Sequence, residues 1–269
     1  MITTLMTTEP FTDPADTDTS AGTTTPIDAH TATPEEKTAR VFDVFQKISE
    51  DYDRVNDVIS MGQHRRWKRN MVRRIVDAGP KKVLDIASGT GDIALKIAAA
   101  LPSAEVIASD FSPNMLEVAK IRAKEDNLGN VQIDQQDATS LSYDDAHFDA
   151  VCVSFGLRNM PDYGLTIQEM TRVLKPGGLF LCLDSSYPTN PIIKPFFRLY
   201  FKHIMPTLGG LIAKAPDEYR WLNDSTEAFL SKDELAALMQ EKGLAEVSYQ
   251  SFMFGGSALH TGVKPLSQS

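Results

Sequence analysis

The chain has 269 residues, of which 42% are hydrophobic, and a formal net charge of −9. This length suits one α/β domain with a substantial core. The acidic balance argues against a general nucleic-acid-binding protein, because such proteins usually present a basic surface. The sequence has no stretch of about 18 apolar residues and no secretory signal pattern, so we expect a cytoplasmic protein without a membrane-spanning helix. The two cysteines have neither metal nor disulfide spacing, and we expect no metal site.

Residues 1–33 form an acidic, Thr-rich segment without Lys or Arg. Because this segment contains few large apolar side chains, it cannot bury enough surface to offset the entropy lost on ordering, and we predict disorder. The motif Thr33–Glu36, TPEE, is a capping box with proline at the first helical position, so an ordered helix should begin there. We expect one domain at 34–265 and a short tail at 266–269.

Apolar strands alternate with amphipathic helices through most of the chain, which predicts a doubly wound, mostly parallel sheet in an α/β fold. The predicted strands lie near 82–87, 105–109, 131–135, 148–154 and 178–184. The predicted helices lie near 91–101, 113–126, 163–174, 190–205 and, behind a capping box, at Ser231–Lys242. Two final apolar runs, Ala245–Phe254 and Leu259–Val263, suit a closing hairpin with one antiparallel strand, which gives seven strands.

The segment before the first strand predicts an N-terminal helical cap over residues 34–80. The remaining residues, 81–265, are expected to form a Rossmann-like core with a lid insertion near 187–228. Pro176–Gly178 should make the turn into the fifth strand. In such open sheets ligands bind at the carboxyl ends of the strands, near the switch in strand order.

The segment Val83–Asp92 reads VLDIASGTGD, an apolar strand containing Asp85, a glycine-flanked turn and a helix start. Gly89 and Gly91 permit a tight turn and a close approach of ligand to backbone, as in a nucleotide-binding loop. Residues 89–94 also fit the dinucleotide pattern G-x-G-x-x-A, but this match alone is weak.

Acidic residues near successive strand ends narrow the choice of ligand. The Asp92 carboxylate at the helix start should repel a pyrophosphate, whereas a cationic sulfonium nucleoside meets no such conflict. Asp110 follows the second strand, where it can accept hydrogen bonds from ribose, and Asp137 follows the third, where it can accept from adenine. We therefore predict S-adenosylmethionine as the ligand. The alternatives are acids that are merely solvated loop residues, and a nicotinamide-dependent oxidoreductase.

Three segments resemble the UbiE/MenG-type C-methyltransferases of ubiquinone and menaquinone biosynthesis. They are YDRVNDVISMGQHRRWK at 52–68, SFGLRNM at 154–160 and RVLKPGGLFLCLDSSYP at 172–188. The resemblance covers about residues 38–265 and implies the class I S-adenosylmethionine-dependent methyltransferase fold. Stretches after residue 185 resemble the menaquinone branch more than the ubiquinone branch.

The resemblance implies cofactor contacts at five positions. Carried over by position, they are Thr90, Asp110, Asp137, Ala138 and Ser154. Asp137 stands where many relatives have Asn, and the family's Leu-Glu-Phe-Ser is Leu-Asp-Ser-Ser at 183–186 in this chain. Both Asp and Asn can accept a hydrogen bond from the adenine amino group, so the donor site is expected to persist with a different charge.

The implied reaction transfers a methyl group to a ring carbon of demethylmenaquinol, a reduced polyprenyl naphthoquinol. Methylation of a ubiquinone precursor or another small aromatic compound is an alternative, and a non-catalytic quinone or lipid carrier is a more distant one. Arg158 and Asn159 are expected to stabilise the developing phenolate, and an internal structural ion pair is the alternative for Arg158. His64, with an unperturbed pKa of about 6.5, is a candidate proton acceptor or a structural residue, with Asp184 and Tyr187 as rivals.

The isoprenoid tail implied for the substrate lies in a bilayer, so we expect transient contact with the inner face of a membrane. Lys194, Arg198 and Lys202 recur every four residues beside Ile and Phe side chains, a pattern typical of a helix at an anionic surface or of one covering a core. Tyr52 is a candidate lid residue over the cofactor. The resemblance also implies self-association.

Overall fold

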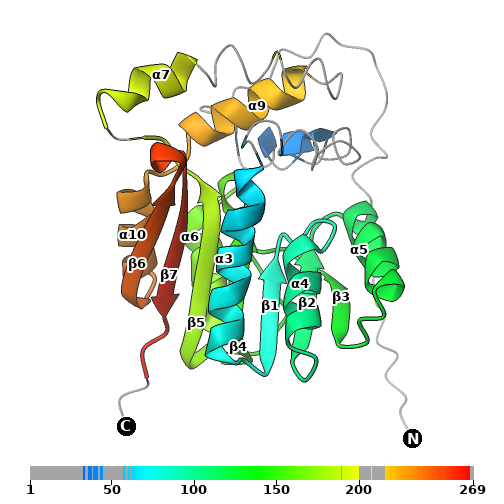
Figure 1. Ribbon diagram of the computed structural model, residues 1–269. Helices are drawn as coiled ribbons and strands as arrows, with labels where there is room; N and C mark the ends of the chain where they lie inside the picture. Colours follow the sequence, from blue (N-terminus) through cyan, green and yellow to red (C-terminus); the bar gives the residue numbers. More distant parts are fainter. Residues whose placement is uncertain are drawn as a thin grey trace, which may run out of the picture.

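The computed structural model describes residues 33, 36, 37, 39–41, 43, 44, 57, 60, 62–188, 190–199, 207 and 216–266, with the backbone alone at 198, 216, 218–220, 222 and 223. Within these residues one sheet runs through the molecule, and helices cover both of its faces (Figure 1). Most of the tail predicted to be disordered at 1–33 lies outside the described residues, and only Thr33 is described. The candidate lid residue Tyr52 and the basic residue Lys202 also lie outside them.

The sheet has seven strands in the order β3-β2-β1-β4-β5-β7-β6. Their bounds are β1 Lys82–Ile86, β2 Glu105–Asp110, β3 Val131–Gln135, β4 Phe148–Ser154, β5 Leu174–Ser185, β6 Ala245–Phe252 and β7 Ser257–Val263. The pairs from β3 to β5 are parallel, and β7 is antiparallel to both β5 and β6. This arrangement confirms the predicted doubly wound sheet with an inserted antiparallel strand. The strand order reverses between β1 and β4, so a ligand cavity is expected at their carboxyl ends.

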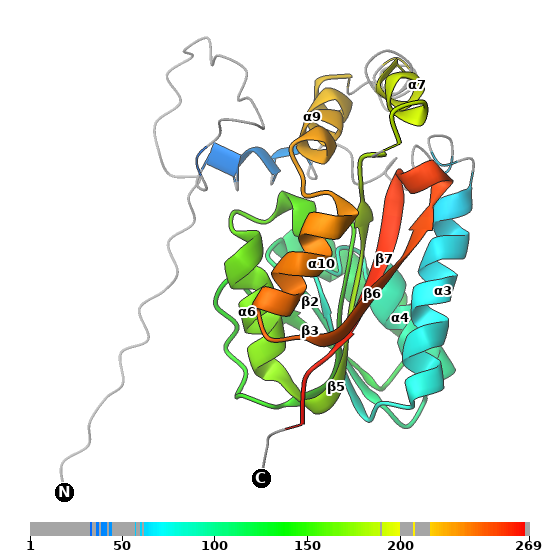
Figure 2. The same cartoon turned by 90° about the vertical axis from the view of Figure 1, so that its left-hand side faces the viewer.

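Helices form a layer on each face of the sheet (Figure 2). One layer contains α3 (Gln63–Ala78) and α4 (Asp92–Ala100), and the other contains α6 (Tyr163–Val173) and α10 (Lys232–Glu241). The further helices are α5 (Pro113–Glu125), which packs against β2 and β3, α7 (Ile193–Leu199) and α9 (Pro216–Glu227). Because α3 packs against α4 and β5, this part of the predicted cap belongs to the helical layer on the sheet.

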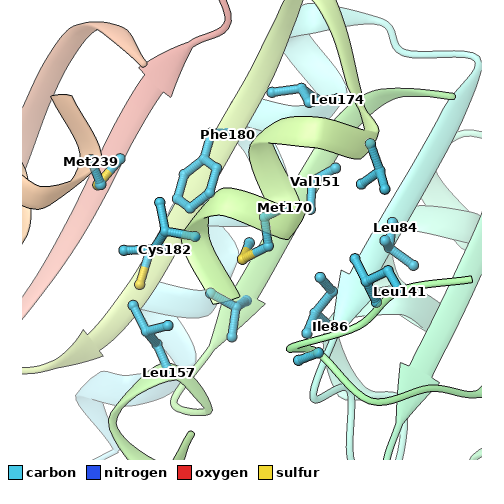
Figure 3. Close-up of a cluster of buried hydrophobic side chains, with 14 of the residues drawn as sticks. Leu84, Ile86, Leu141, Val151, Leu157, Met170, Leu174, Phe180, Cys182 and Met239 are labelled. Atoms are coloured by element: carbon cyan, nitrogen blue, oxygen red, sulfur yellow. The ribbon is translucent and has the colours of Figure 1, made fainter. Parts of the chain in front are cut away.

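The core lies on both faces of the central strands, whose side chains are buried in near-continuous runs, as expected where helices cover a parallel sheet twice. On the α6 and α10 side, Phe180, Met170 and Leu157 interlock with the surrounding aliphatic side chains (Figure 3). On the other side, Trp67 and Met71 of α3 pack against the sheet. Trp67 also stacks on Phe252 of β6 with ring centroids 5.5 Å apart, which fixes α3 across the far edge of the sheet.

Local signals in the sequence predicted the element boundaries well. Both capping boxes are present: Thr33 and Glu36 exchange backbone-to-side-chain hydrogen bonds, as do Ser231 and Glu234. The expected turn at 176–178 is instead an irregularity inside a longer β5, where the register against β4 shifts and Gly177 has φ +78°. Helix α9 was not predicted. Within the described residues, none of the helices combines the length and apolar character needed to cross a membrane.

Candidate functional site

A cavity of about 240 Å³ opens at the carboxyl ends of β1, β2 and β4, where the strand order reverses. Of the eight residues predicted to bind the cofactor, all but Gly91 line this cavity. The seven are Asp85, Gly89, Thr90, Asp110, Asp137, Ala138 and Ser154. Gly91 follows Thr90 in the sequence and is the N-cap residue of α4. The fold therefore brings the predicted cofactor residues from four separate segments to one place.

The loop between β1 and α4 depends on glycine geometry. Gly89 and Gly91 have φ angles of +55° and +82°, a left-handed conformation that other residues adopt only with strain. The Gly89 N–H donates to Asp110 Oδ2 at 2.8 Å, which ties the loop to the end of β2. Arg122 of α5 donates from Nη1 to both the carbonyl oxygen (3.0 Å) and the hydroxyl oxygen (2.9 Å) of Thr90. The loop is therefore held from two sides before any ligand binds.

Asp110 is bonded on both of its carboxylate oxygens. Besides the Gly89 contact, Oδ1 accepts the Ser112 N–H at 2.9 Å, and burial raises the pKa of the carboxyl group. Because each carboxylate oxygen can accept more than one hydrogen bond, ribose hydroxyls can still be accommodated. Asp137 Oδ1 accepts from both the N–H and the hydroxyl of Thr139, at 2.8 and 2.7 Å, which shapes the loop after β3.

Asp85 is buried, and only 1% of its surface is exposed. One oxygen accepts the Ala94 N–H in the first turn of α4 at 3.0 Å, and the other accepts the Cys152 thiol at 3.4 Å. Burial raises the pKa of Asp85 to about 7, despite these hydrogen bonds. Asp85 is thus a buried hydrogen-bonding group of the cavity lining that holds a proton more readily than an exposed carboxyl group does.

Asp92 does not offer the unopposed negative charge that the sequence suggested. Lys68 of α3 donates to its Oδ2 at 2.9 Å, and Lys96 forms a very short contact with Oδ1. Although burial opposes ionisation, these two ammonium groups hold the pKa of Asp92 well below its usual range. The predicted repulsion of a pyrophosphate by Asp92 is therefore wrong as stated, because the charge is neutralised by two lysines.

Lys68 is the functional candidate that sequence reasoning missed. Its side chain is 10% exposed and lines the cavity, where the other charged lining side chains among the described residues are carboxylates. The only signal in the sequence was its place in the basic run HRRWK, where Lys68 is indistinguishable from its exposed neighbours. Its approach to Asp92 depends on the packing of α3 against α4.

Three buried side-chain oxygens along the cavity lining have no hydrogen-bond partner within the described structure. They belong to Ser88, Ser154 and Asn159. Buried polar groups are rarely left unsatisfied, and orphaned ones at a cavity indicate a place for a polar ligand. Together with the carboxylates of Asp110 and Asp137 and the ammonium group of Lys68, they provide partners for hydroxyl, amino and carboxylate groups. These residues fit S-adenosylmethionine, which carries all three kinds of group.

Arg158 and Asn159 lie in the 3₁₀ turn η1 (Leu157–Asn159) that follows β4, and both are buried. Arg158 forms the internal ion pair that was its alternative interpretation: Nη1 contacts Asp184 Oδ1 at 2.6 Å and donates to the Phe155 carbonyl at 3.0 Å. Asp184 Oδ2 also accepts the Arg158 backbone N–H at 3.1 Å. Asn159, and not Arg158, lines the cavity.

The candidate proton acceptors lie outside the cavity lining. His64 is 6% exposed, its Nδ1 is 3.0 Å from Ser60 Oγ, and its Nε2 is 3.6 Å from Asp57. Asp184 is engaged by Arg158, and Tyr187 packs edge-on against Phe197 with ring centroids 5.4 Å apart. A catalytic role for any of them stays a prediction. No group of three side chains suited to bind a metal occurs among the residues that the structure describes.

Comparisons with known proteins agree with this geometry. The chain is 45% identical over 226 residues to a demethylmenaquinone methyltransferase of Staphylococcus carnosus, a match covering 84% of this chain and 93% of the relative. It is 43% identical to the protein of the same name in Staphylococcus saprophyticus, covering 85% and 97%. A SAM-dependent methyltransferase structure from Thermotoga maritima matches with a TM-score of 0.56 at 17% identity, covering 83% of this chain and 99% of that one.

The structural match supports the class I methyltransferase fold, and the sequence matches go further. Residues 33–264 match the ubiE/COQ5 methyltransferase family. This range includes all seven strands of the described sheet and the residues that line the cavity. The family resemblance read from the three sequence segments is confirmed, and the enzyme is a methyltransferase. This chain belongs to the ubiE/COQ5 methyltransferase family.

Proposed function

We propose that the protein transfers a methyl group from S-adenosylmethionine to a ring carbon of demethylmenaquinol, forming menaquinol. The observation that carries the proposal is the orphaned buried amide oxygen of Asn159 in the cavity that also contains Asp110 and Asp137. A donor site and an unsatisfied polar group for an acceptor thus share one cavity. The names of relatives at 43–45% identity supply the substrate class.

On the donor side, we assign Asp110 to the ribose hydroxyls and Asp137 with Ala138 to the adenine. The clamp of Arg122 on Thr90 and the Gly89–Asp110 hydrogen bond fix the loop beside them. When bound, S-adenosylmethionine supplies an electrophilic methyl group on a positively charged sulfur. Preorganised hydrogen-bonding groups of this kind orient a ligand without an ordering cost at the moment of reaction.

Lys68 is suited to the carboxylate of the donor's methionine portion. Its ammonium group is nearly buried, lies at the cavity and already pairs with a carboxylate, that of Asp92. A second carboxylate nearby can share this ammonium group, because lysine has three donor hydrogens. Lys96 keeps Asp92 paired when Lys68 turns toward a ligand.

On the acceptor side, ring carbons become nucleophilic when a ring hydroxyl loses its proton and its charge spreads into the ring. Among the orphaned lining groups we assign Asn159 to that hydroxyl, because its Oδ1 can accept a hydrogen bond from the hydroxyl before the proton leaves. Arg158 holds the turn in place through Asp184. Asn159 is therefore proposed as the residue that touches substrate, and Arg158 as a positioning residue. The isoprenoid tail of such a substrate implies transient contact with a membrane surface.

The direct test incubates the full-length protein with S-adenosylmethionine and demethylmenaquinol and follows the quinone by mass spectrometry. A mass gain of one CH₂ unit is expected, and it should be absent with a heat-inactivated sample. Calorimetry should give heat of binding with S-adenosylmethionine and none with NAD. Binding of NAD alone, or no methylated product with active donor binding, would contradict the proposal.

The Lys68 assignment has a sharper test of its own. Lys68→Met should weaken the binding of S-adenosylhomocysteine, because this ligand carries the carboxylate. The binding of 5′-methylthioadenosine, which lacks the carboxylate, should stay unchanged. Asp110→Ala serves as the matched control, because it should weaken both ligands through the ribose that they share. Equal losses for both ligands in Lys68→Met would remove Lys68 from the carboxylate site.

A further inference from the structure

Four of the five most exposed large apolar side chains of the described residues lie at one end of the molecule, whereas the fifth, Leu266, lies at the other end beside Gly177. Ile192, Phe196 and Leu199, in and just before α7, are 74%, 72% and 58% exposed, and Phe254 in the 3₁₀ turn η3 (Met253–Gly255) is 82% exposed. Monomeric proteins rarely leave such side chains together in water without a binding role. We call these four residues the apolar tip.

The four side chains belong to one packed unit. Phe197 of α7 is buried, and its ring lies against Gly256, where a Cβ atom would come within 2.5 Å of it. Both views show α7 beside the turn between β6 and β7 (Figures 1 and 2). The contact through Phe197 and Gly256 therefore holds α7 on the hairpin and leaves Phe196 and Phe254 facing outward.

The backbone of the hairpin turn adds a second, independent observation. Met253 and Phe254 have φ angles of +47° and +56°, a region that bulky residues other than glycine rarely occupy. Phe254 thus combines a backbone conformation that is costly for a bulky residue with an exposed ring. Such strain is a pointer to function, because the left-handed conformation favours Asn or Gly at this position.

The position and charge of the apolar tip favour a lipid surface as its partner. Helix α7 follows the carboxyl end of β5, which is parallel to β4, so the tip and the ligand cavity lie at the same end of the sheet. The exposed Lys194 flanks the tip on α7, and the Lys232 ammonium group lies beside Gly255, 3.9 Å from where a Cβ would stand. Aromatic and aliphatic side chains flanked by amines match the boundary between acyl chains and anionic headgroups.

We propose that the apolar tip inserts into an anionic bilayer and brings the cavity to a substrate whose tail lies in that bilayer. This inference rests on the proposed function for the lipid nature of the substrate. It extends the basic helix expected from sequence by adding the β6–β7 hairpin, which the sequence predicted as a hairpin but not as part of a membrane-binding surface. Insertion of Phe254 places its ring in an apolar medium, where the exposed ring is stabilised.

The test uses the full-length protein and vesicles of phosphatidylcholine with phosphatidylglycerol, read by co-sedimentation. Phe254→Asn is the informative variant, because asparagine tolerates the left-handed backbone and the substitution should not weaken the fold. We expect vesicle binding at least about tenfold weaker and an unfolding midpoint in urea equal to or above that of the parent. Phe196→Ser should also weaken vesicle binding. Ile121→Ser, which removes a side chain 50% exposed on α5, is the matched control and should bind as the parent does.

A second readout separates this inference from the proposed function. Phe254→Asn should lower methylation of a polyprenyl naphthoquinol embedded in vesicles and leave methylation of a tail-less naphthoquinol unchanged. If no naphthoquinol is methylated but vesicle binding still depends on Phe254, the proposed substrate fails and the docking surface stands. Failure of the parent to bind vesicles, or equal binding by Phe254→Asn, overturns the inference. A dimer in sedimentation velocity that Phe254→Asn dissociates overturns it in favour of self-association.

Discussion

Replacing Arg158 by methionine should both destabilise the fold and slow the reaction, because this arginine is the partner of a buried carboxylate. The side chains of Arg158 and Asp184 are only 6% and 1% exposed, and Nη1 lies 2.6 Å from Oδ1. Arg158→Met preserves most of the side-chain volume and, among the described residues, leaves Asp184 with hydrogen bonds from the backbone N–H groups of residue 158 and Ser185. The buried negative charge then lacks its counter-ion.

The expected loss is large for a single substitution. Removing one member of a buried ion pair costs about 3–5 kcal/mol, because the remaining charge is left uncompensated in the interior. The double variant Arg158→Met with Asp184→Asn should recover about 1–3 kcal/mol of this loss, since the amide is neutral. Its single oxygen can replace one of the two carboxylate oxygens that accept the backbone N–H groups, so the recovery should be incomplete. Turnover should fall about 100-fold, because Asn159 is the next residue in the same turn and a shift of about 1 Å in a positioning group has an effect of this size.

Urea denaturation followed by circular dichroism gives the free energy of unfolding, and calorimetry gives the affinity for the donor. Lys120→Met is the control, because Lys120 forms a loose surface pair with Glu117, both being more than 60% exposed, at 3.9 Å. Its unfolding free energy should stay within about 0.5 kcal/mol of the parent. If Arg158→Met lost turnover at unchanged stability, Arg158 would act directly on substrate, and the structural interpretation would be refuted.

Three further substitutions test the cavity itself. Asp110→Ala should weaken the binding of the donor, measured by calorimetry, far more than it raises the KM for the quinol. Equal losses for the two ligands would contradict the assignment of Asp110 to the ribose. Asp85→Asn should flatten the pH dependence of stability: because the folded pKa of Asp85 is raised to about 7, the native state holds an extra proton between about pH 4 and that value, and the parent's unfolding free energy falls as the pH rises through this window. The free energy of unfolding is measured by urea denaturation at several pH values. If it changed with pH equally in the parent and in Asp85→Asn, this prediction would be contradicted. Gly156→Ala places a Cβ 2.6 Å from that of Ala87 and should lower the free energy of unfolding by about 1–3 kcal/mol. The control Gly129→Ala, which has open space around it, should not lower it. Equal urea midpoints for the two variants would show that the residues around Gly156 move to accept the methyl group.

Local chemistry explains why much of the fold was predictable. The capping boxes at Thr33 and Ser231 depend on side chains three residues apart, and the glycine loop depends on Gly89 and Gly91 alone. Apolar runs of strand length predicted β3 and β4 at their observed ends. Each of these signals acts within a few residues, so it can be read before any tertiary contact is known.

The features that escaped prediction all depend on contacts between distant segments. The Lys68–Asp92 pair joins residues 24 positions apart and the Arg158–Asp184 pair joins residues 26 apart, and no local pattern links either pair. The Arg122 clamp on Thr90 spans 32 positions. The closing hairpin was predicted, but the left-handed conformation of Met253 and Phe254 and the exposure of the Phe254 ring were not, because neither residue type favours that conformation. Charge pairing and exposure are therefore tertiary properties, and residue type alone did not determine them.

The neutralisation of Asp92 changes the reason for excluding a dinucleotide without changing the conclusion. A pyrophosphate usually binds the free N–H groups at a helix start, where the helix dipole favours negative charge. In this chain the start of α4 is already occupied from within, because the Asp85 carboxyl group accepts the Ala94 N–H and Asp92 stands at the first helical position. Lys68 and Lys96 balance the second acid, so the helix start presents no uncompensated charge to a pyrophosphate, and the proposed carboxylate of the donor shares only the Lys68 ammonium group. The donors and acceptors left for a ligand lie along the cavity wall, from Asp110 to Ser154 and Asn159, which matches a nucleoside with a short polar arm better than a pyrophosphate bridge.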